Sequence, residues 1–468
     1  MNAPVRRQIP AVSRILDALG QCDLPRPLIV QLVRRKLSQI RANNDVPEFE
    51  SIVAGVRRSL EELRASRLQP VVNGTGIVIH TNFGRAPLPS KAMHALNEIG
   101  AAYSNLEYDL AKSERGGRGV YVESALAALC EAEAATVVNN CAAALLLIVT
   151  HFTKRKSDRR TSNAEPRTEV VISRGELVQI GGGFRISEIL EASGAKLREV
   201  GATNKTTFED YAHAVGPETA MILKVHRSNF FMNGFVESPS SNEIRALARK
   251  NRIPFVEDLG SGAIAATEKF TLVEHEPTVS EVLRMGVDLV CFSGDKLFGG
   301  PQVGIIAGKR RFVSALKRDP FFRALRCDKL ILSALQATTE LHLAENFDAI
   351  PILNLLATSV AELEQRADKI VTQLRSVSIE AKAERTHSQI GGGALPRSKI
   401  ESVAIELRSK YFSADEMATR SRTGNPPVIG YIAKDAFKLD IRTVFPSQDE
   451  KLTASLCRSL GKPAARRD

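Results

Sequence analysis

The chain has 468 residues, more than the roughly 100–200 of a usual single domain, so two or three structural units are expected. Hydrophobic residues make up 43% of it, enough for a sizeable core, whereas the absence of Trp and an aromatic content of 5% argue against a base-stacking surface of the single-strand-binding type. The formal net charge of +11 favours a polyanionic partner or anionic ligands, although a generally basic proteome would account for it equally well.

The spacing of the cysteines and the length of the apolar runs indicate where in the cell the protein is located. The six cysteines are scattered, without a CxxC or Cys/His spacing, which predicts a reducing environment and no structural zinc. No apolar stretch follows Arg6 and Arg7 as a signal peptide would require. The longest apolar run, residues 141–149, is far shorter than the ~20 residues that span a membrane. We therefore expect a cytoplasmic protein.

Residues 1–66 are predicted to form a helical unit of their own. Apolar residues recur with helical spacing in residues 9–16, 28–37 and 52–68. The last segment bears Arg57, Arg58, Arg64 and Arg67. Such a basic face can bind phosphates, but charged outer faces are usually just solvated, and charge alone favours the second interpretation.

From residue 70 the pattern changes to short apolar runs that alternate with helical segments. Five runs are typical of buried strands: residues 136–140, 169–173, 220–226, 253–258 and 287–293. Helices are expected between them, at residues 123–133 and 241–251. This alternation predicts an α/β domain over residues 67–330, with a mostly parallel sheet covered on both faces. Functional residues are then expected at the carboxyl ends of the strands.

The remaining chain is predicted to form a helical link and a smaller unit. Residues 331–377 lie in a long helical region that begins near residue 329 and connects the two domains. Residues 378–468 are expected to form a small α+β domain, with candidate strands at residues 402–407 and 437–442.

Lys296 is the first candidate for chemistry. It follows a predicted strand and lies between Ser293-Gly294-Asp295 and Gly299-Gly300-Pro301. Small residues on both sides allow the backbone to approach a flat ligand closely. A partly desolvated lysine has a lowered pKa and can form an imine with an aldehyde such as pyridoxal phosphate. The alternative is an ordinary surface lysine in a turn.

Two further strand ends add an acid and a histidine. Asp258 ends the preceding predicted strand, where a carboxylate could keep a pyridinium nitrogen protonated, although an aspartate there could equally cap the next helix. His226 ends the strand before that and could touch the cofactor ring or its phenolic oxygen, but an isolated histidine is more often a satisfied core residue.

A phosphate-binding helix start is predicted at Asn140, Cys141 and Ala142. A strand ends there and a helix of small residues begins, so free backbone N–H groups are available to a phosphate. The order of phosphate loop, acid and lysine along the chain is the order that fold type I pyridoxal enzymes use.

Several arginines point to anions beyond the cofactor phosphate. Arg85 and Arg118 lie in glycine-containing loops, and Arg323 and Arg326 are spaced to share one face of a helix. Arginine is suited to bidentate recognition of phosphate-like groups, whereas for any single arginine a surface ion pair is the commoner role.

Several motifs in the same order make the sequence similar to the bacterial selenocysteine synthases. These are the L-seryl-tRNA(Sec) selenium transferases, which belong to the fold type I pyridoxal-phosphate enzymes. The resemblance covers nearly the whole chain. It rests on residues 80–85 (HTNFGR), 173–177 (SRGEL), 225–230 (VHRSNF), 293–297 (SGDKL), 391–396 (GGGALP) and 422–424 (RTG). Asn425 and Tyr431 stand where the family commonly has an acid and an arginine.

The resemblance implies a role for each candidate residue. Lys296 would hold pyridoxal phosphate as an internal aldimine, with Asp258 on the pyridine nitrogen and residues 140–142 on the phosphate. Selenophosphate would be bound by Arg85, Arg323 and Arg326, with Arg118 a further candidate. No metal is expected.

The resemblance also implies a reaction and partners. The enzyme would convert L-seryl-tRNA(Sec) to L-selenocysteinyl-tRNA(Sec) through a cofactor-bound aminoacrylate, and residues 1–66 would grip the tRNA. The assembly would be a homo-oligomer, typically a decamer built from five dimers. Two alternatives remain: a small-molecule pyridoxal lyase of the sugar-acid ammonia-lyase type, which would lack the helical N-terminal unit, and a non-catalytic tRNA-binding relative, which would not need Lys296 and Asp258.

Overall fold

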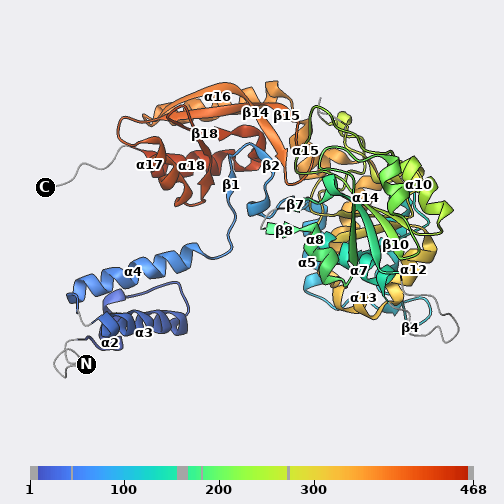
Figure 1. The fold of residues 1–468 in the computed structure, drawn as a ribbon. Coiled ribbons are helices and arrows are strands. Elements are labelled where there is room, and N and C mark those ends of the chain that lie inside the picture. The colour runs from blue at the N-terminus through green and yellow to red at the C-terminus, as the bar shows by residue number, and fades with distance from the viewer. Residues whose placement is uncertain (1–8, 44–45, 155–166, 181–182, 271–274, 462–468) are drawn as a thin grey trace.

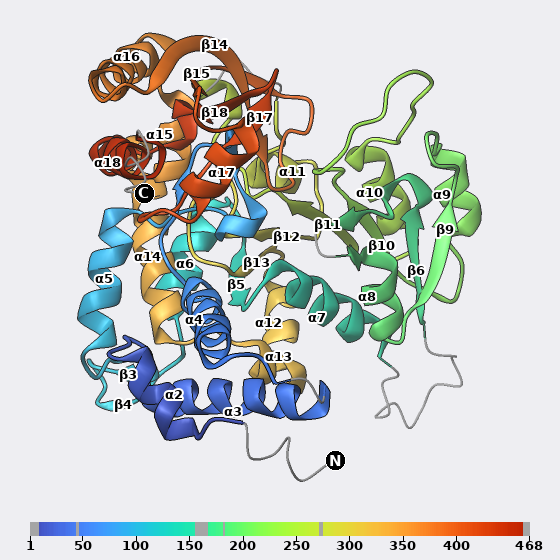
Figure 2. The same ribbon diagram turned by 90° about the vertical axis from the view of Figure 1, so that its left-hand side faces the viewer.

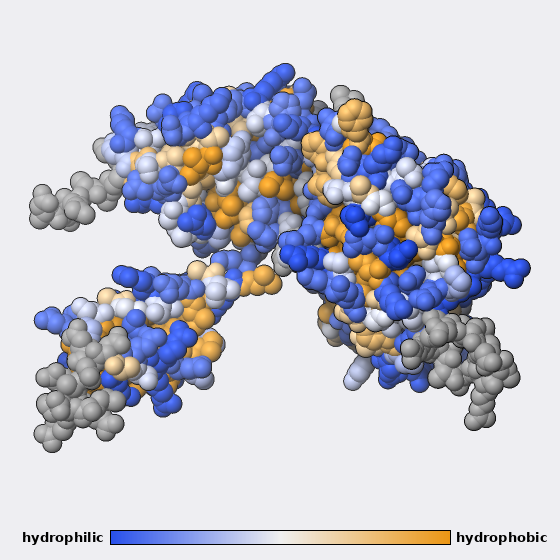
Figure 3. Space-filling view, viewed as in Figure 1, coloured by the Kyte–Doolittle hydropathy of each residue, from blue (hydrophilic) through white to orange (hydrophobic). Residues whose placement is uncertain are grey.

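The computed structural model describes residues 9–43, 46–154, 167–180, 183–270 and 275–461. Its N-terminal part consists of α2 (Val12–Leu19), α3 (Arg26–Asn43) and α4 (Phe49–Ala65), which pack around a small apolar core of their own. The three predicted helical segments are thus helices, although α4 ends at Ala65, well before residue 68. These helices stand apart from the rest of the chain (Figures 1 and 3).

A seven-stranded sheet forms the centre of the large domain (Figure 2). Its order is β5 (Ala134–Val138), β13 (Gly304–Gly308), β12 (Leu289–Ser293), β11 (Phe255–Gly260), β10 (Thr219–Val225), β6 (Glu169–Ser173) and β9 (Lys196–Val200). All neighbours are parallel except β13, which is antiparallel to both β12 and β5. The predicted mostly parallel sheet is confirmed. β6 has its predicted bounds, and the other predicted strands differ at one or both ends by one or two residues.

Both faces of this sheet carry a core because successive residues of its strands point to opposite sides. Phe255 and Val290 belong to one apolar cluster, together with Leu126 of α6 (Val120–Leu129). Val256 and Leu289 belong to a second cluster, together with Ile148 of α7 (Cys141–Thr153). Other helices complete the two layers: α8 (Ile186–Ala192), α9 (Phe208–Ala214), α10 (Ser241–Lys250), α11 (Val279–Arg284) and α12 (Arg310–Arg318). Strands buried on both faces therefore explain the continuous apolar runs of the sequence.

The region after the large sheet, predicted to be helical, is divided into separate helices. It contains α14 (Lys329–Leu343), α15 (Pro351–Ala357) and α16 (Val360–Ser376). Pro351 occupies the first turn of α15, where its missing N–H is tolerated, and the side chain of Ser359 caps α16. Two chain turns therefore separate the helices, and α14 packs against α5 (Ser90–Gly100) and α6 of the large domain.

The small domain is built on a five-stranded sheet. Its order is β17 (Tyr431–Ala433), β18 (Ala436–Asp440), β15 (Lys399–Arg408), β14 (Glu380–Gly391) and β2 (Ile77–Ile79). In addition, β1 (Val72–Asn73) pairs with β16 (Val428–Ile429). The predicted boundary near residue 67 places residues 72–79 with the large domain, whereas their strands pair with the small one. Within the described ranges, no helix has the length and apolar character that a membrane span requires.

Candidate active site

Three neighbouring strands bring His226, Asp258 and Lys296 to one edge of the large sheet. In the register, Val225 lies opposite Asp258, and Asp258 lies opposite Cys291. The backbone N–H of His226 donates to the carbonyl of Asp258 at 2.8 Å. Asp258 does not end its strand as predicted, because β11 continues to Gly260 after a shift in register. The carboxyl ends of parallel strands thus form the site, as the fold requires.

Lys296 lies buried beside two glycines. Its exposed fraction is 4%, and burial lowers the pKa of its amine. A Cβ atom added to Gly393 would lie 3.1 Å from the Lys296 Nζ, and one added to Gly260 would lie 3.6 Å from it. Both glycines have positive φ, at 79° and 63°. Gly393 comes from the loop after β14, so the backbone of both domains comes close to Nζ, where a side chain at Gly393 would crowd the amine.

Asp258 is a buried carboxylate with weak donors around it. It is 7% exposed, and burial raises its pKa, which the neighbouring Lys296 partly opposes. The thiol of Cys141 donates to its Oδ1 at 3.5 Å. In the described part of the chain, Asp258 forms no ion pair with a lysine, arginine or histidine. A buried acid of this kind fits the cationic nitrogen of a pyridinium ring as its partner.

The predicted phosphate loop is the N-terminus of α7. The side chain of Asn140 accepts a hydrogen bond from the N–H of Ala143 at 2.8 Å and caps the helix. Cys141 and Ala142 begin the first turn, where backbone N–H groups have no partner within the helix. The N–H of Asn139 donates to the carbonyl of Leu325 at 2.9 Å, which brings the next residue, Arg326, to this loop.

The four predicted anion-binding arginines do not form one group. Arg85 makes two contacts with Asp295, at 2.9 and 3.1 Å, beside Lys296. Arg118 and Arg326 instead converge on Glu107, at 3.1 and 3.4 Å, and the guanidinium groups around Glu107 hold its pKa below the usual value.

Arg323 and Arg326 do not share a helical face as predicted. Arg323 is exposed on α13 (Pro320–Leu325), and Arg326 lies beyond its end in extended conformation, at φ −70° and ψ 144°. The next helix begins after Asp328, whose side chain caps it, so Arg326 and Cys327 form the turn between the two helices.

Comparison with known proteins agrees with this geometry. Residues 71–445 match the family model of the L-seryl-tRNA selenium transferases. The chain belongs to this family. The L-seryl-tRNA(Sec) selenium transferase of Geotalea daltonii is 43% identical over 96% of this chain and 98% of its own length. The protein of the same name from Aquifex aeolicus is 37% identical over 94% of this chain and 95% of its own.

Among solved structures, D-glucosaminate-6-phosphate ammonia-lyase is similar in fold. The TM-score is 0.59 at 19% identity, over 83% of this chain and 95% of that one. This chain is thus a selenium transferase with the fold of type I pyridoxal-phosphate enzymes, and pyridoxal phosphate is its cofactor. The buried Asp258, the desolvated Lys296 and the space beside Gly393 fit that cofactor.

Sequence reasoning missed three members of the transferase site. Cys291 lies on β12 opposite Asp258, and its sulfur, that of Cys141 and a carboxylate oxygen of Asp258 lie within 4.8 Å of one another. Cys291 lies in the predicted strand at residues 287–293, and this position could have indicated that it lies near Asp258. Glu276, 2% exposed, lies 3.2 Å from the Nε2 of His226, and Gly393 borders Lys296. No local pattern marks Glu276, whereas Gly393 lies in the 391–396 motif, to which no role beside Lys296 had been given.

Proposed function

We propose that the protein converts L-seryl-tRNA(Sec) to L-selenocysteinyl-tRNA(Sec), with selenophosphate as the selenium donor. The observation that carries this is the buried pair of Asp258 on β11 and Lys296 just after the neighbouring β12, in a chain that belongs to the selenium transferase family. A small-molecule ammonia-lyase is not favoured, because that likeness extends to the fold alone.

The residues of the site suit the chemistry of an esterified serine. Pyridoxal phosphate, when bound, withdraws electrons from the α-carbon of the attached amino acid. Asp258 would keep the pyridine nitrogen protonated, and the first turn of α7 at Asn140, Cys141 and Ala142 would receive the phosphate. Because its pKa is lowered, Lys296 can accept the proton of the α-carbon as a free amine. His226, fixed by Glu276, would orient the ring from the third strand.

The selenium donor is a small phosphate-like anion, so arginines are its natural partners. Arg85 lies next to Lys296, and Arg326 lies beside the α7 N-terminus. We assign Arg85 and Arg326 as the first ligands of the anion. Arg118 is a further candidate, because it contacts Glu107 together with Arg326. Arg323 is exposed on α13, so it would approach the anion from the solvent side.

The N-terminal helices would bind the tRNA. Arg64 and Arg67 each contact Asp23 at 3.2 Å, and Arg57 donates to the carbonyl of Ala18 at 2.9 Å. Arg64 and Arg67 therefore brace α4 against the segment that joins α2 and α3, and Arg57 braces it against the end of α2. Arg58 on α4 and Arg34 and Arg35 on α3 are exposed and suit the phosphate backbone of RNA.

The protein would act as a cytoplasmic homo-oligomer, a decamer of five dimers by resemblance to its family. Large apolar side chains remain exposed around α5, α6 and α14: Met93, Tyr103, Leu110, Val120, Tyr121 and Leu330. Such a surface is typical of a protein interface. The cysteines are all free, which suits a reducing compartment.

The direct test combines the purified protein with seryl-tRNA(Sec), selenophosphate and pyridoxal phosphate. The expected product is selenocysteinyl-tRNA(Sec), detected by acid gel or mass spectrometry of the aminoacyl ester. No selenocysteine on the tRNA, together with keto acid released from a free small substrate, would favour the lyase instead.

A further inference from the structure

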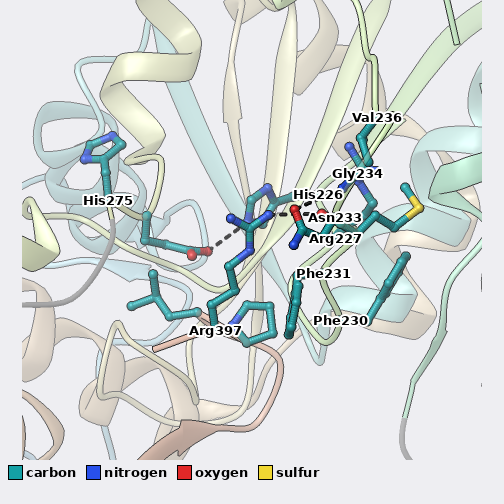
Figure 4. Close-up of a pocket in the computed structure, with 13 residues that line it drawn as sticks. His226, Arg227, Phe230, Phe231, Asn233, Gly234, Val236, His275 and Arg397 are labelled. Atoms are coloured by element: carbon teal, nitrogen blue, oxygen red, sulfur yellow. Dashed lines mark hydrogen bonds and ion pairs between the residues drawn. The ribbon is translucent and has the colours of Figure 1, made fainter. Parts of the chain in front are cut away.

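A cavity of about 490 Å³ opens beside His226. The large domain contributes the loop after β10, including Arg227 and Phe231, and the small domain contributes Arg397. Figure 4 shows these side chains around a common space. The cavity is therefore built from both domains.

This cavity adjoins the Lys296 site. Leu395 and Pro396 line it and also line a second cavity of about 280 Å³, whose walls include Arg85 and Gly393. Gly393 in turn borders the Lys296 Nζ. The larger cavity thus shares a wall with the cavity that is bordered by Gly393, the neighbour of Lys296.

The lining combines an aromatic ring with guanidinium groups. The Cζ of Arg397 lies 5.2 Å from the centroid of the Phe231 ring, and its Nη2 donates to the carbonyl of Met232 at 3.1 Å. The Phe231 side chain is nevertheless 54% exposed, so much of the ring is available. Among the lining residues that the structure describes, Glu276 is the single acid, and it is paired with His226.

We propose that this cavity binds the 3′-terminal nucleotide of the seryl-tRNA. The terminal base would stack on Phe231, and the adjoining phosphate would meet Arg227 and Arg397. The inference rests on the proposed function: serine is esterified to the terminal ribose, so the terminal nucleotide must lie in a space continuous with Lys296. The low aromatic content excludes an extended stacking surface, but one base needs one ring.

A larger basic cavity elsewhere does not meet this requirement. It has a volume of about 740 Å³ and is lined by Arg245, Arg249, Arg311 and other residues. Its lining also includes Phe255, where β11 begins, and Asp288, which precedes β12. It therefore lies at the amino ends of the strands, at the opposite edge of the sheet from Lys296.

The test compares Phe231→Ala with Phe235→Ala. Phe235 lies in the same loop and is 95% exposed, but it does not line the cavity. Stacking of one base contributes about 1–3 kcal/mol, so kcat/KM for seryl-tRNA(Sec) should fall roughly 5- to 150-fold in Phe231→Ala and stay unchanged in Phe235→Ala. Cofactor absorbance, equal in all three proteins, would show that both variants are folded.

A change in the substrate makes the test independent of the stability of the variant. Seryl-tRNA(Sec) with an abasic 3′-terminal residue should be a poorer substrate of the wild-type enzyme by the same factor, whereas Phe231→Ala should use both substrates equally. Wild-type activity that is indifferent to the terminal base, or a Phe231→Ala enzyme with wild-type kcat/KM, would overturn the subsite alone. A wild-type enzyme inactive on authentic seryl-tRNA(Sec) would instead overturn the proposed function.

Discussion

Replacing Gly393 by alanine tests whether the space beside Lys296 is the cofactor site. The added Cβ would lie 3.1 Å from the Lys296 Nζ and 3.4 Å from the Ser228 Oγ, closer than the roughly 3.5–4.0 Å of ordinary contacts. The residue also has φ 79°, a conformation that costs a side chain about 1–2 kcal/mol. We expect Gly393→Ala to lose stability by about that amount and to lose cofactor binding as well.

Gly194 provides a matched control for backbone strain. It has φ 80°, and an added Cβ would meet no atom within 4 Å. Gly194→Ala should therefore show the same loss in the free energy of unfolding, measured by urea denaturation, but normal pyridoxal phosphate titration by absorbance and normal selenium transfer. The reasoning is refuted if Gly393→Ala binds the cofactor with wild-type affinity and turns over at the wild-type rate.

Three further predictions concern buried ionisable groups. Lys296→Ala should lose the absorbance band that pyridoxal phosphate acquires in the wild-type protein, and a persisting band would contradict the lysine assignment. Asp258→Asn should keep the cofactor but transfer selenium about 100-fold more slowly in single-turnover assays, because the ring nitrogen loses its counter-ion. A decrease in rate of less than about tenfold would count against Asp258 as this counter-ion. Burial raises the pKa of Glu176 from 4.5 to about 7, so the folded protein holds this proton more tightly than the unfolded chain does. The protonated Glu176 therefore stabilises the fold fully below pH 4.5, and this stabilisation is lost as the pH rises to about 7. In Glu176→Gln, the free energy of unfolding should no longer change with pH for this reason, as urea denaturation across this pH range would show.

The large sheet was predictable because its central strands are buried on both faces. Continuous apolar runs marked β6, β10, β11 and β12, and the polar residues after them marked the functional edge. β13, Gly304–Gly308, was missed although it lies between β5 and β12. It is short and bounded by glycines, and no local pattern indicates an antiparallel strand inserted between distant partners.

The site was predictable only where its residues follow strands. His226, Asp258 and Lys296 converge because their strands are neighbours in the sheet. Arg326 was misplaced because spacing implies a shared face only while a helix continues, and α13 ends at Leu325. Gly393 reaches Lys296 from a loop of the other domain, a contact that depends on how the two sheets are joined.

The connection between the domains places one loop beside both the proposed cofactor site and the proposed terminal-nucleotide cavity. After α4 the chain enters the small domain, where β1 pairs with β16 and β2 pairs with β14 (Figure 1). The loop that follows β14 places Gly393 at Lys296 and Arg397 over Phe231. The first strands after the N-terminal helices thus pair with the small domain that carries this loop, rather than with the large sheet that leads to Lys296. A tRNA held by those helices would therefore be connected, through residues 66–71, to the domain whose loop lines the proposed terminal-nucleotide cavity.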